Sequence, residues 1–274
     1  MSEIWVTKES GERELFDPKK ALVALERAGL GAGDAKEVLG QLESEIYDGI
    51  STKKIYGMLF DLVDRMRPEV THKFNLKRAL MDIGPEGYDF EDFISKLLNT
   101  HGYDTLTRQT LQGKCVTHEI DVIASKERKS YMMECKFHNQ PGARCRIQTI
   151  LYVYARFLDL REGAKAGLCR SFAAPWLVTN TKFSEDVITY AECKGLPLLG
   201  WHYPYRNSLE AMIEKSGCYP VSVIKMREDT LRRLLKSKII TVFDIPDSPQ
   251  KLAGASGISK AEAEEIIGRA EFAK

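Results

Sequence analysis

The sequence lacks long apolar runs and a strong charge of either sign. No stretch of about 18 apolar residues, the length that can cross a bilayer, occurs among the 274 residues. The first ten residues, MSEIWVTKES, lack the apolar region of a signal peptide. The formal net charge of +1 excludes a polycationic tail, so any nucleic-acid contact must come from local patches. We therefore expect a cytoplasmic protein with no membrane partner.

The cysteines lack the spacing of a metal site. None of the six belongs to a C-x-x-C pair, and no histidine cluster accompanies them. This pattern argues against a structural zinc site and is typical of reduced, mostly buried thiols. The chain also shows no internal repeat and no low-complexity tract, which excludes a solenoid.

The residue pattern changes near residues 85 and 216, which divides the chain into three predicted domains. Domains usually contain about 100 to 200 residues, so two or three are expected in a chain of this length. The fold class that we predict is a multidomain α+β and α/β protein. Its domains are residues 1–85, a hairpin followed by a helical bundle, residues 86–215, a mixed sheet flanked by helices, and residues 216–274, a small all-α domain.

The first predicted domain begins with two short apolar runs, IWVTK and RELF, joined by a polar turn that contains Gly11. Asp17, with a proline directly after it, is typical of the start of a helix. Asp34 and Ser51 are the expected N-caps of a second and a third helix, and Pro68 precedes a fourth. The hairpin is therefore expected to lead into a small bundle.

Three motifs in this domain, VTKESG, FDPKKALVALERAG and YDGISTKKIY, resemble the ATP-cone, the regulatory nucleotide-binding module of ribonucleotide reductases and their repressors. The resemblance implies ATP or dATP as a regulatory ligand. No GxxxxGK[ST] loop occurs, so we expect no hydrolysis of the nucleotide. Lys8 and Lys20 offer charge for phosphates, although both are also explained as solvated surface cations. The implied nucleotide-binding residues are Val6, Lys8, Glu14, Asp17, Lys20, Thr52 and Tyr56.

The middle domain contains an amphipathic helix, expected at residues 89–101 with Asp89 as its N-cap, and then a hairpin. The runs IDVIAS and SYMMECKFH alternate with period two on either side of KERK. A turn of even length places Asp121 directly opposite Glu134. One face of the hairpin is then apolar, and the other carries Glu119, Asp121, Glu134 and Lys136.

Two directly opposed carboxylates repel each other, and a divalent cation between them would relieve the repulsion. Mg²⁺ binds one or two carboxylates and completes its shell with water and phosphate oxygens. Lys136 would hold an attacking water or stabilise the charge on phosphorus. The pattern predicts phosphodiester cleavage with Mg²⁺ or Mn²⁺. Two alternatives stay open: a solvated face on which Glu119 and Lys136 form an ordinary ion pair, and an odd-length turn that separates the acids.

The helix FEDFISKLLNTHGY, the hairpin HEIDVIA…MMECKF and the helix IQTILYVYARF resemble the restriction-endonuclease-like PD-(D/E)xK superfamily, most closely its Mrr-like branch. The run PWLVTNTKFSEDVITYAECKGLPLLGW is similar to the strand, helix and strand that complete that fold. Glu91 is also explained by the helix macrodipole, and Gln148 by a bond to Tyr152 or to solvent. The resemblance implies Asp121 and Glu134 as metal ligands, Lys136 as the catalytic lysine, Glu91 as the first-helix acid and Gln148 as the helix glutamine.

The run LAGASGISKAEAEEII near the C-terminus resembles a helix-hairpin-helix motif. Such hairpins bind DNA phosphates through backbone N–H groups at the start of the second helix. A plain helical packing or protein-docking module is the alternative. The resemblance implies DNA contacts at Gly257, Ser259 and Lys260.

Taken together, these patterns predict a divalent-metal-dependent DNA endonuclease regulated by an adenine nucleotide. Cleavage of both strands would need two active sites, so the family resemblance implies a homo-oligomer, a dimer or larger. A nucleotide-responsive DNA-binding regulator that does not cleave is the first alternative. A nuclease for RNA or branched DNA is the second, because loops and partner subunits set the shape of the substrate.

Overall fold

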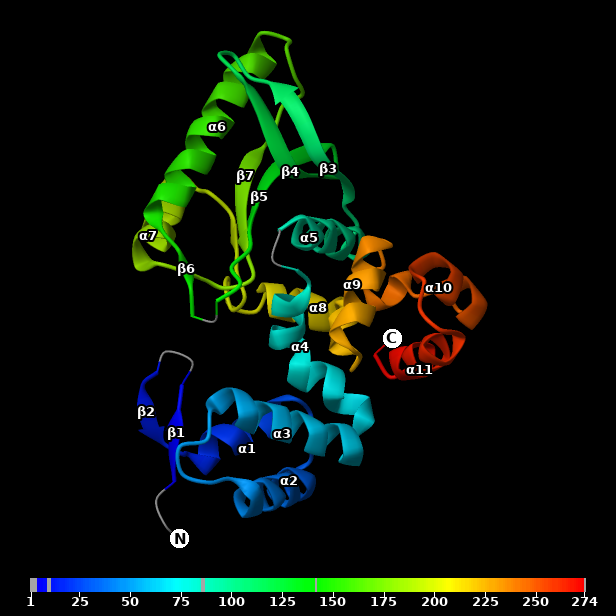
Figure 1. Ribbon diagram of the computed structural model, residues 1–274. Coiled ribbons are helices and arrows are strands. Elements are labelled where there is room, and N and C mark those ends of the chain that lie inside the picture. The colour runs from blue at the N-terminus through cyan, green and yellow to red at the C-terminus, as the bar shows by residue number, and fades with distance from the viewer. Residues whose placement is uncertain (1–3, 9–10, 85–86, 141, 274) are drawn as a thin grey trace. The chain divides into compact units, whose positions relative to one another are not determined.

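The computed structural model describes residues 4–8, 11–84, 87–140 and 142–273 (Figure 1). The chain forms two compact units, residues 1–77 with 268–273 and residues 78–267. The three-domain division stays a prediction, and its first boundary, at residues 85 and 86, lies outside the described residues. Among the residues described, no helix combines the length and the apolar character needed to cross a membrane.

The first unit begins with the expected hairpin and continues into helices. Strand β1 (Trp5–Thr7) pairs antiparallel with β2 (Arg13–Leu15), and residues 9 and 10 of the expected turn lie outside the described residues. The expected caps are confirmed at Asp17, which accepts from the Lys19 backbone N–H at 3.0 Å, and at Ser51. The helices are α1 (Pro18–Arg27), α2 (Ala32–Glu45), α3 (Thr52–Met66) and α4 (Thr71–Asp82), with a 3₁₀ turn at Pro68–Val70.

The prediction for Asp34 was wrong. Gly31 is the N-cap of α2, and Asp34 lies inside the first turn, where its Oδ2 accepts from Arg67 Nε at 2.7 Å. An acid in the first turn favours the helix dipole, so its sequence pattern resembles that of a cap. The helices bury one face against a shared core that includes Leu25, Leu42 and Val63, and full burial of each such side chain stabilises the fold by about 1.5–3 kcal/mol.

The second unit contains a five-stranded mixed sheet with the strand order β3-β4-β5-β7-β9. The first three strands are antiparallel, and the last three are parallel. Two very short strands, β6 (Arg144–Cys145) and β8 (Lys182–Phe183), pair separately. The bounds of the sheet strands are β3 (Asp104–Gln112), β4 (Thr117–Lys126), β5 (Lys129–Lys136), β7 (Ala174–Thr179) and β9 (Leu198–Leu199).

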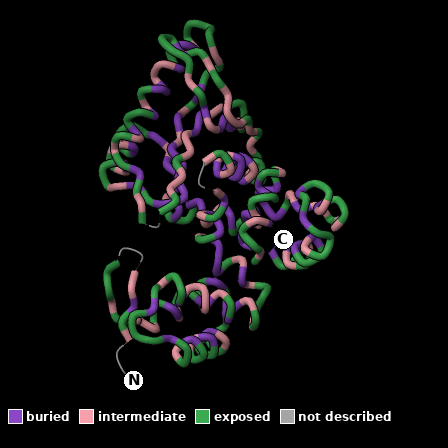
Figure 2. Tube along the Cα trace, viewed as in Figure 1, coloured by how far each residue is buried: buried purple, intermediate pink, exposed green. Residues whose placement is uncertain are grey.

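Helices cover both faces of this sheet, with α5 and α6 on opposite sides (Figure 1). Helix α5 buries Phe90, Phe93 and Leu97 completely, as its apolar stripe predicts, and these buried stretches are visible in Figure 2. Its N-cap is Gly87 rather than Asp89, which lies in the first turn. The helices between the strands and after them are α5 (Tyr88–Thr100), α6 (Ile147–Lys165), α7 (Glu185–Lys194) and α8 (Leu209–Ser216).

The β4–β5 hairpin has the predicted register. Ser125 pairs with Ser130, and the ladder runs back to the pair Val122 and Met133. The turn consists of Glu127 and Arg128, which have φ values of 50° and 65°. Two successive residues with positive φ are typical of a two-residue type I′ turn, whose twist matches that of the strands. The even-length turn on which the opposition of Asp121 and Glu134 depends is therefore present.

The region around Asp121 departs from a regular ladder. Asp121 pairs with neither β3 nor β5. Arg108, the residue opposite it on β3, has a φ of 51°. Period-two alternation also predicted Ile120 on the face opposite Ile123, whereas both belong to one core cluster with Phe157 of α6. The strand is therefore irregular at the position where the predicted carboxylate lies.

A close backbone contact fixes the β3–β4 connection to α6. A Cβ atom added to Gly163 would lie 2.8 Å from the backbone carbon of Gly113, so no larger residue fits without movement. The Asp159 carboxylate on the same helix accepts hydrogen bonds from the Cys115 backbone N–H at 2.8 Å and from His118 Nε2, also at 2.8 Å. These hydrogen bonds hold the Asp159 carboxylate as an anion and lower its pKa to about 2.

After α8, the described residues of the second unit form helices, and one isolated bridge joins Pro220 to Thr241. Gly257, with a φ of 68°, is the C-cap of α10, and α11 begins three residues later. Two helices joined by a short turn therefore lie at this position, and the helix-hairpin-helix motif stays a prediction. The elements are α9 (Glu228–Lys236), α10 (Pro249–Ser256), α11 (Lys260–Ala270) and 3₁₀ turns at Val221–Val223 and Val242–Asp244.

Candidate active site

Asp121 lies where β4 and β5 separate. Beyond the pair Val122 and Met133 the ladder ends, and Asp121 Oδ2 accepts a hydrogen bond from the Cys135 backbone N–H at 2.7 Å. The carboxylate thus takes the position that a backbone carbonyl would have in a continued ladder. This bond fixes the direction of the Asp121 side chain at the open end of the hairpin.

Glu134 forms an ion pair that the sequence patterns did not predict. Arg156 Nη1 on α6 donates to Glu134 Oε2, and the two side chains are only 9% and 16% exposed. The guanidinium carbon also lies 5.1 Å from the centre of the Tyr152 ring. Within the described part of the chain, Arg156 Nε is buried without a hydrogen-bond partner. Arg156 thus places a positive charge of this chain beside Glu134, and the divalent cation stays a prediction.

Arg156 could have been found from helix geometry. It follows Gln148 by eight residues and Tyr152 by four, so all three side chains lie along one face of α6. Gln148, in the first turn of the helix, is exposed. The sequence patterns gave Arg156 no role, because an arginine in a helix usually indicates a solvated face.

Glu91 on α5 lies near these acids. Its Oε2 is 3.3 Å from Arg108 Nη1, and Arg108 Nη2 donates to Asp92 at 2.7 Å. Lys238 Nζ donates to the other oxygen of Asp92, also at 2.7 Å. The unusual backbone of Arg108 therefore lets one guanidinium join two acids of α5 beside the irregular part of β4.

Burial raises the pKa of each candidate carboxyl group. The pKa of Glu91 rises to about 7, first because of burial and then because of the nearby Asp121 charge, while Arg108 opposes the shift. Burial also raises the pKa of Asp121, although the Cys135 N–H favours the ionised form. For Glu134, burial and Asp121 raise the pKa against the opposing effect of Arg156 and Lys136. The three acids therefore influence each other's ionisation.

Lys136 ends β5 with an exposed side chain, and its backbone carbonyl accepts from Thr179 Oγ1 at 2.7 Å. Glu119 is exposed as well, and among the described residues no ion pair joins it to Lys136. The side chains of the two histidines beside the hairpin have other partners, since His118 Nε2 lies 2.8 Å from Asp159 Oδ2 and His138 Nε2 lies 3.4 Å from Cys145 Sγ. The described chain has no group of three His, Cys, Asp or Glu residues arranged to hold a metal ion.

The predicted nucleotide residues of the first unit surround one pocket of about 200 Å³. Lys8 is not part of the lining, but its Nζ lies 3.0 Å from Glu14 Oε2, and Lys20 Nζ lies 3.6 Å from the same oxygen. Tyr56 stacks on Phe74 and donates its hydroxyl to the Phe74 carbonyl at 2.8 Å. The predicted residues in the lining are Val6, Glu14, Asp17, Lys20, Thr52 and Tyr56.

The predicted phosphate contacts at the start of α11 have a carboxylate beside them. Glu262 accepts from the Ser259 backbone N–H at 3.0 Å and from Ser259 Oγ at 2.7 Å. Lys260 Nζ lies 3.6 Å from Glu264. Arg233 donates to the Gly257 carbonyl at 2.6 Å. An acid therefore occupies one N–H group that was expected to bind phosphate, and the DNA contact stays a prediction.

A mixed sheet between helices, with acids at the open end of its central hairpin, is the arrangement of restriction-endonuclease-like proteins. A family model described as Restriction endonuclease (Mrr_cat) matches residues 85–200. The chain is 36% identical over 178 residues to an uncharacterized protein from Archaeoglobus fulgidus, an alignment covering 65% of this chain and 98% of that protein. The chain therefore belongs to the family of that protein, and residues 85–200 form a restriction-endonuclease-like domain.

Two solved structures complete the comparison. The crystal structure of AF1548, a protein of unknown function, is 37% identical with a TM-score of 0.57, and the match covers 67% of this chain and 96% of that one. MspJI restriction endonuclease in complex with a 27-mer oligonucleotide is 14% identical, with a TM-score of 0.29 over 74% of this chain and 50% of that one. The TM-score of MspJI is too low to support any further argument.

Proposed function

We propose that this protein is a divalent-metal-dependent endonuclease that hydrolyses phosphodiester bonds of DNA. The observation that carries the proposal is the pair of half-buried carboxylates, Asp121 and Glu134, at the open end of a hairpin within the restriction-endonuclease domain. Lys136 ends the second strand of the same hairpin, and Glu91 approaches from α5. Restriction endonuclease-like nucleases generally use Mg²⁺ or Mn²⁺, and the family supports DNA as the substrate.

The chemistry of the donors fits a hard divalent cation. Asp121, Glu134 and Glu91 offer only oxygen atoms, which Mg²⁺ and Mn²⁺ prefer. We assign Asp121 and Glu134 as the ligands. When bound, such a cation would supply Lewis acidity toward the phosphate and toward a water molecule. Arg156 would keep Glu134 in its ionised form and oriented when no cation is present.

The remaining residues would position the reactants. The Lys136 ammonium, beside two carboxylates, would hold the attacking water or stabilise negative charge on the phosphate. Gln148, exposed on the face of α6 that carries Arg156, would contact the same water or a phosphate oxygen. Glu91, with a pKa of about 7, can accept or release a proton at neutral pH.

Plasmid cleavage tests the proposal. Purified protein is incubated with supercoiled plasmid and Mg²⁺ or Mn²⁺, and nicked and linear products are measured. Lys136→Ala and Asp121→Asn should each lower the rate by about 100-fold or more, the effect of removing one stabilising group from an active site. Lys165→Ala, which removes an exposed lysine at the end of α6, should change the rate less than twofold. Cleavage that survives both active-site changes would contradict the assignment.

We also propose that ATP or dATP binds the pocket of the first unit and regulates activity. Six of the seven predicted residues line this pocket, and Lys8 and Lys20 lie close to Glu14 at its wall. A nucleotide phosphate would replace the Glu14 carboxylate as the partner of these two lysines. Calorimetric titration with ATP and dATP should show binding that Lys20→Ala weakens, whereas equal affinities in the wild type and the variant would contradict the site.

One observation favours a second candidate, a nucleotide-responsive DNA-binding regulator that does not cleave. Arg156 already neutralises Glu134, so the acids can be stable without a metal ion. DNA binding that needs no metal and changes with ATP, with no nicking under Mg²⁺ or Mn²⁺, would establish this function. The homo-oligomer that two-strand cleavage requires is tested by measuring molar mass with and without ATP.

A further inference from the structure

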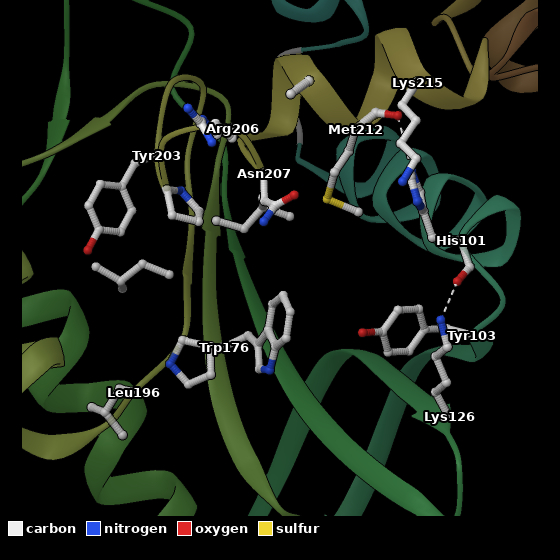
Figure 3. Close-up of a pocket in the computed structure, with 15 residues that line it drawn as sticks. His101, Tyr103, Lys126, Trp176, Leu196, Tyr203, Arg206, Asn207, Met212 and Lys215 are labelled. Carbon is white, nitrogen blue, oxygen red and sulfur yellow. Dashed lines mark hydrogen bonds between the residues drawn. The ribbon is translucent and has the colours of Figure 1, made fainter.

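The second unit contains a pocket of about 570 Å³ whose wall is aromatic and cationic (Figure 3). Trp176 of β7 forms part of its lining, together with Tyr103 and Tyr203. Pockets of about 300–1,000 Å³ are the usual size for small-molecule ligands. The lining also carries Lys126, Arg206, Lys215 and His101, and it contains no Asp or Glu.

This pocket is separate from the candidate active site. Trp176 and Leu177 are neighbours on β7, so their side chains point to opposite faces of the sheet. Leu177 packs in the cluster formed with α6 and α7, and Glu134, its partner in the ladder, binds Arg156 of α6. Trp176 therefore points to the face opposite Glu134, and no candidate active-site residue is part of the pocket lining.

The aromatic side chains are held rigidly. Tyr131 packs edge-on against Trp176, with ring centres 5.8 Å apart, and against Tyr103 at 6.4 Å. Figure 3 shows the Tyr103 hydroxyl pointing toward the Trp176 ring. Flat ligands stack on such supported rings with little loss of side-chain freedom.

The polar groups of the pocket include several donors. Trp176 Nε1 is buried and has no hydrogen-bond partner among the residues that the structure describes. A buried N–H without an acceptor is unfavourable. Lys126 Nζ donates to the His101 carbonyl at 2.9 Å and lies 5.0 Å from the centre of the Tyr103 ring, so this cation is held at the wall.

Arg206 and Lys215 are exposed at the pocket edge. Tyr203 donates its hydroxyl to Glu192, 3.5 Å away, and Glu192 is not part of the lining. An anion at the pocket edge gains charge-assisted hydrogen bonds from Arg206 or from Lys215. A nucleotide combines a flat ring with such an anion.

We propose that this pocket binds a nucleotide unit, with its base beside Trp176 and its phosphate near Arg206 or Lys215. A free mononucleotide and the terminal nucleotide of a strand share this chemistry. The site is independent of the proposed cleavage and of the pocket in the first unit, so its test uses binding and not activity.

Calorimetric titration of the full chain with AMP is the first test. Arg206→Ala with Lys215→Ala should weaken binding about tenfold or more, because hydrogen bonds to charged groups are lost. A matched control, Lys165→Ala with Lys182→Ala, removes two exposed lysines elsewhere in the unit and should leave the affinity within twofold. Equal effects of the two double variants, or no AMP binding beyond the first-unit pocket, would overturn the proposal.

Fluorescence locates the base. AMP should quench the tryptophan emission of the wild type, and Trp176→Phe should abolish this quenching while keeping a ring at the position. Quenching retained in Trp176→Phe would overturn the proposal, as would inorganic phosphate that binds as tightly as AMP. A 5′-phosphorylated single strand distinguishes the two sources: competition by AMP at equal concentration indicates the free nucleotide, and tighter binding of the strand indicates the strand terminus.

Discussion

Replacing Arg156 by methionine should destabilise the second unit strongly and in a way that depends on pH. The change leaves Glu134, whose side chain is 16% exposed, without its cation. Removing one partner of a buried pair costs about 3–5 kcal/mol. A loss of 1 kcal/mol lowers the melting temperature by about 2–4 °C for a unit of this size, so a fall of roughly 6–20 °C is expected. Thermal unfolding without added metal measures this fall in melting temperature.

The pH dependence identifies the cause. Arg156 lowers the pKa of Glu134, so the variant raises that pKa further, and the unpaired acid can escape the penalty by binding a proton. The loss should therefore be largest at high pH and shrink as the pH falls. Mg²⁺ at about 100 times its dissociation constant should raise the free energy of unfolding of the variant by roughly 2.7 kcal/mol, because it binds only the folded state.

Two further variants control this experiment. Adding Glu134→Gln to Arg156→Met removes the orphaned charge, so the double variant should be more stable at pH 8 than Arg156→Met alone. Arg161→Met alters an exposed arginine of the same helix and should change stability by less than about 0.5 kcal/mol. Equal losses in the single and double variants, at every pH, would refute an electrostatic role for Arg156.

The raised pKa values of Glu91, to about 7, and of Asp121 and Glu134 predict that Mg²⁺ affinity falls as the pH drops below 7, which calorimetry at several pH values measures. Without metal the folded state binds extra protons between pH 4.5 and 7, so these groups should lower stability as the pH rises through that range. Gly163→Ala should cost about 1–3 kcal/mol by overpacking against Gly113, whereas Gly57→Ala, with open space around it, should not destabilise the protein in thermal unfolding. Glu262→Gln keeps an acceptor for the cap but removes the charge, so it should tighten DNA binding in a low-salt titration, and unchanged affinity would argue against contact at α11.

Local patterns predicted much of the restriction-endonuclease domain. The helix stripe of α5 and the hairpin register depend on periodicities of a few residues, and the structure confirms them. The strand, helix and strand after α6 were expected from the family resemblance, and they are present as β7, α7 and β9. The N-caps of two helices were misplaced at Asp34 and Asp89, because an acid in the first turn and an acid at the cap produce similar sequences.

Local sequence patterns could not predict which residues contact the carboxylates of the candidate site. The ion pair between Glu134 and Arg156 joins residues 22 positions apart through packing of α6 on the sheet. The positive φ of Arg108 lets its side chain reach Glu91 and Asp92, and no local propensity favours that backbone for an arginine. The roles assigned to Asp121, Glu134, Lys136, Gln148 and Glu91 stay predictions.

The two-residue turn at Glu127 and Arg128 has a consequence for how this gene can vary. Five ladder pairs separate it from the place where the strands part. Substitutions in the turn leave the register unchanged, but one inserted or deleted residue would move an apolar side chain to the position opposite Asp121. We therefore expect related sequences to keep the length of this turn constant while exchanging its two residues among those that tolerate positive φ, such as Asn, Asp and Gly.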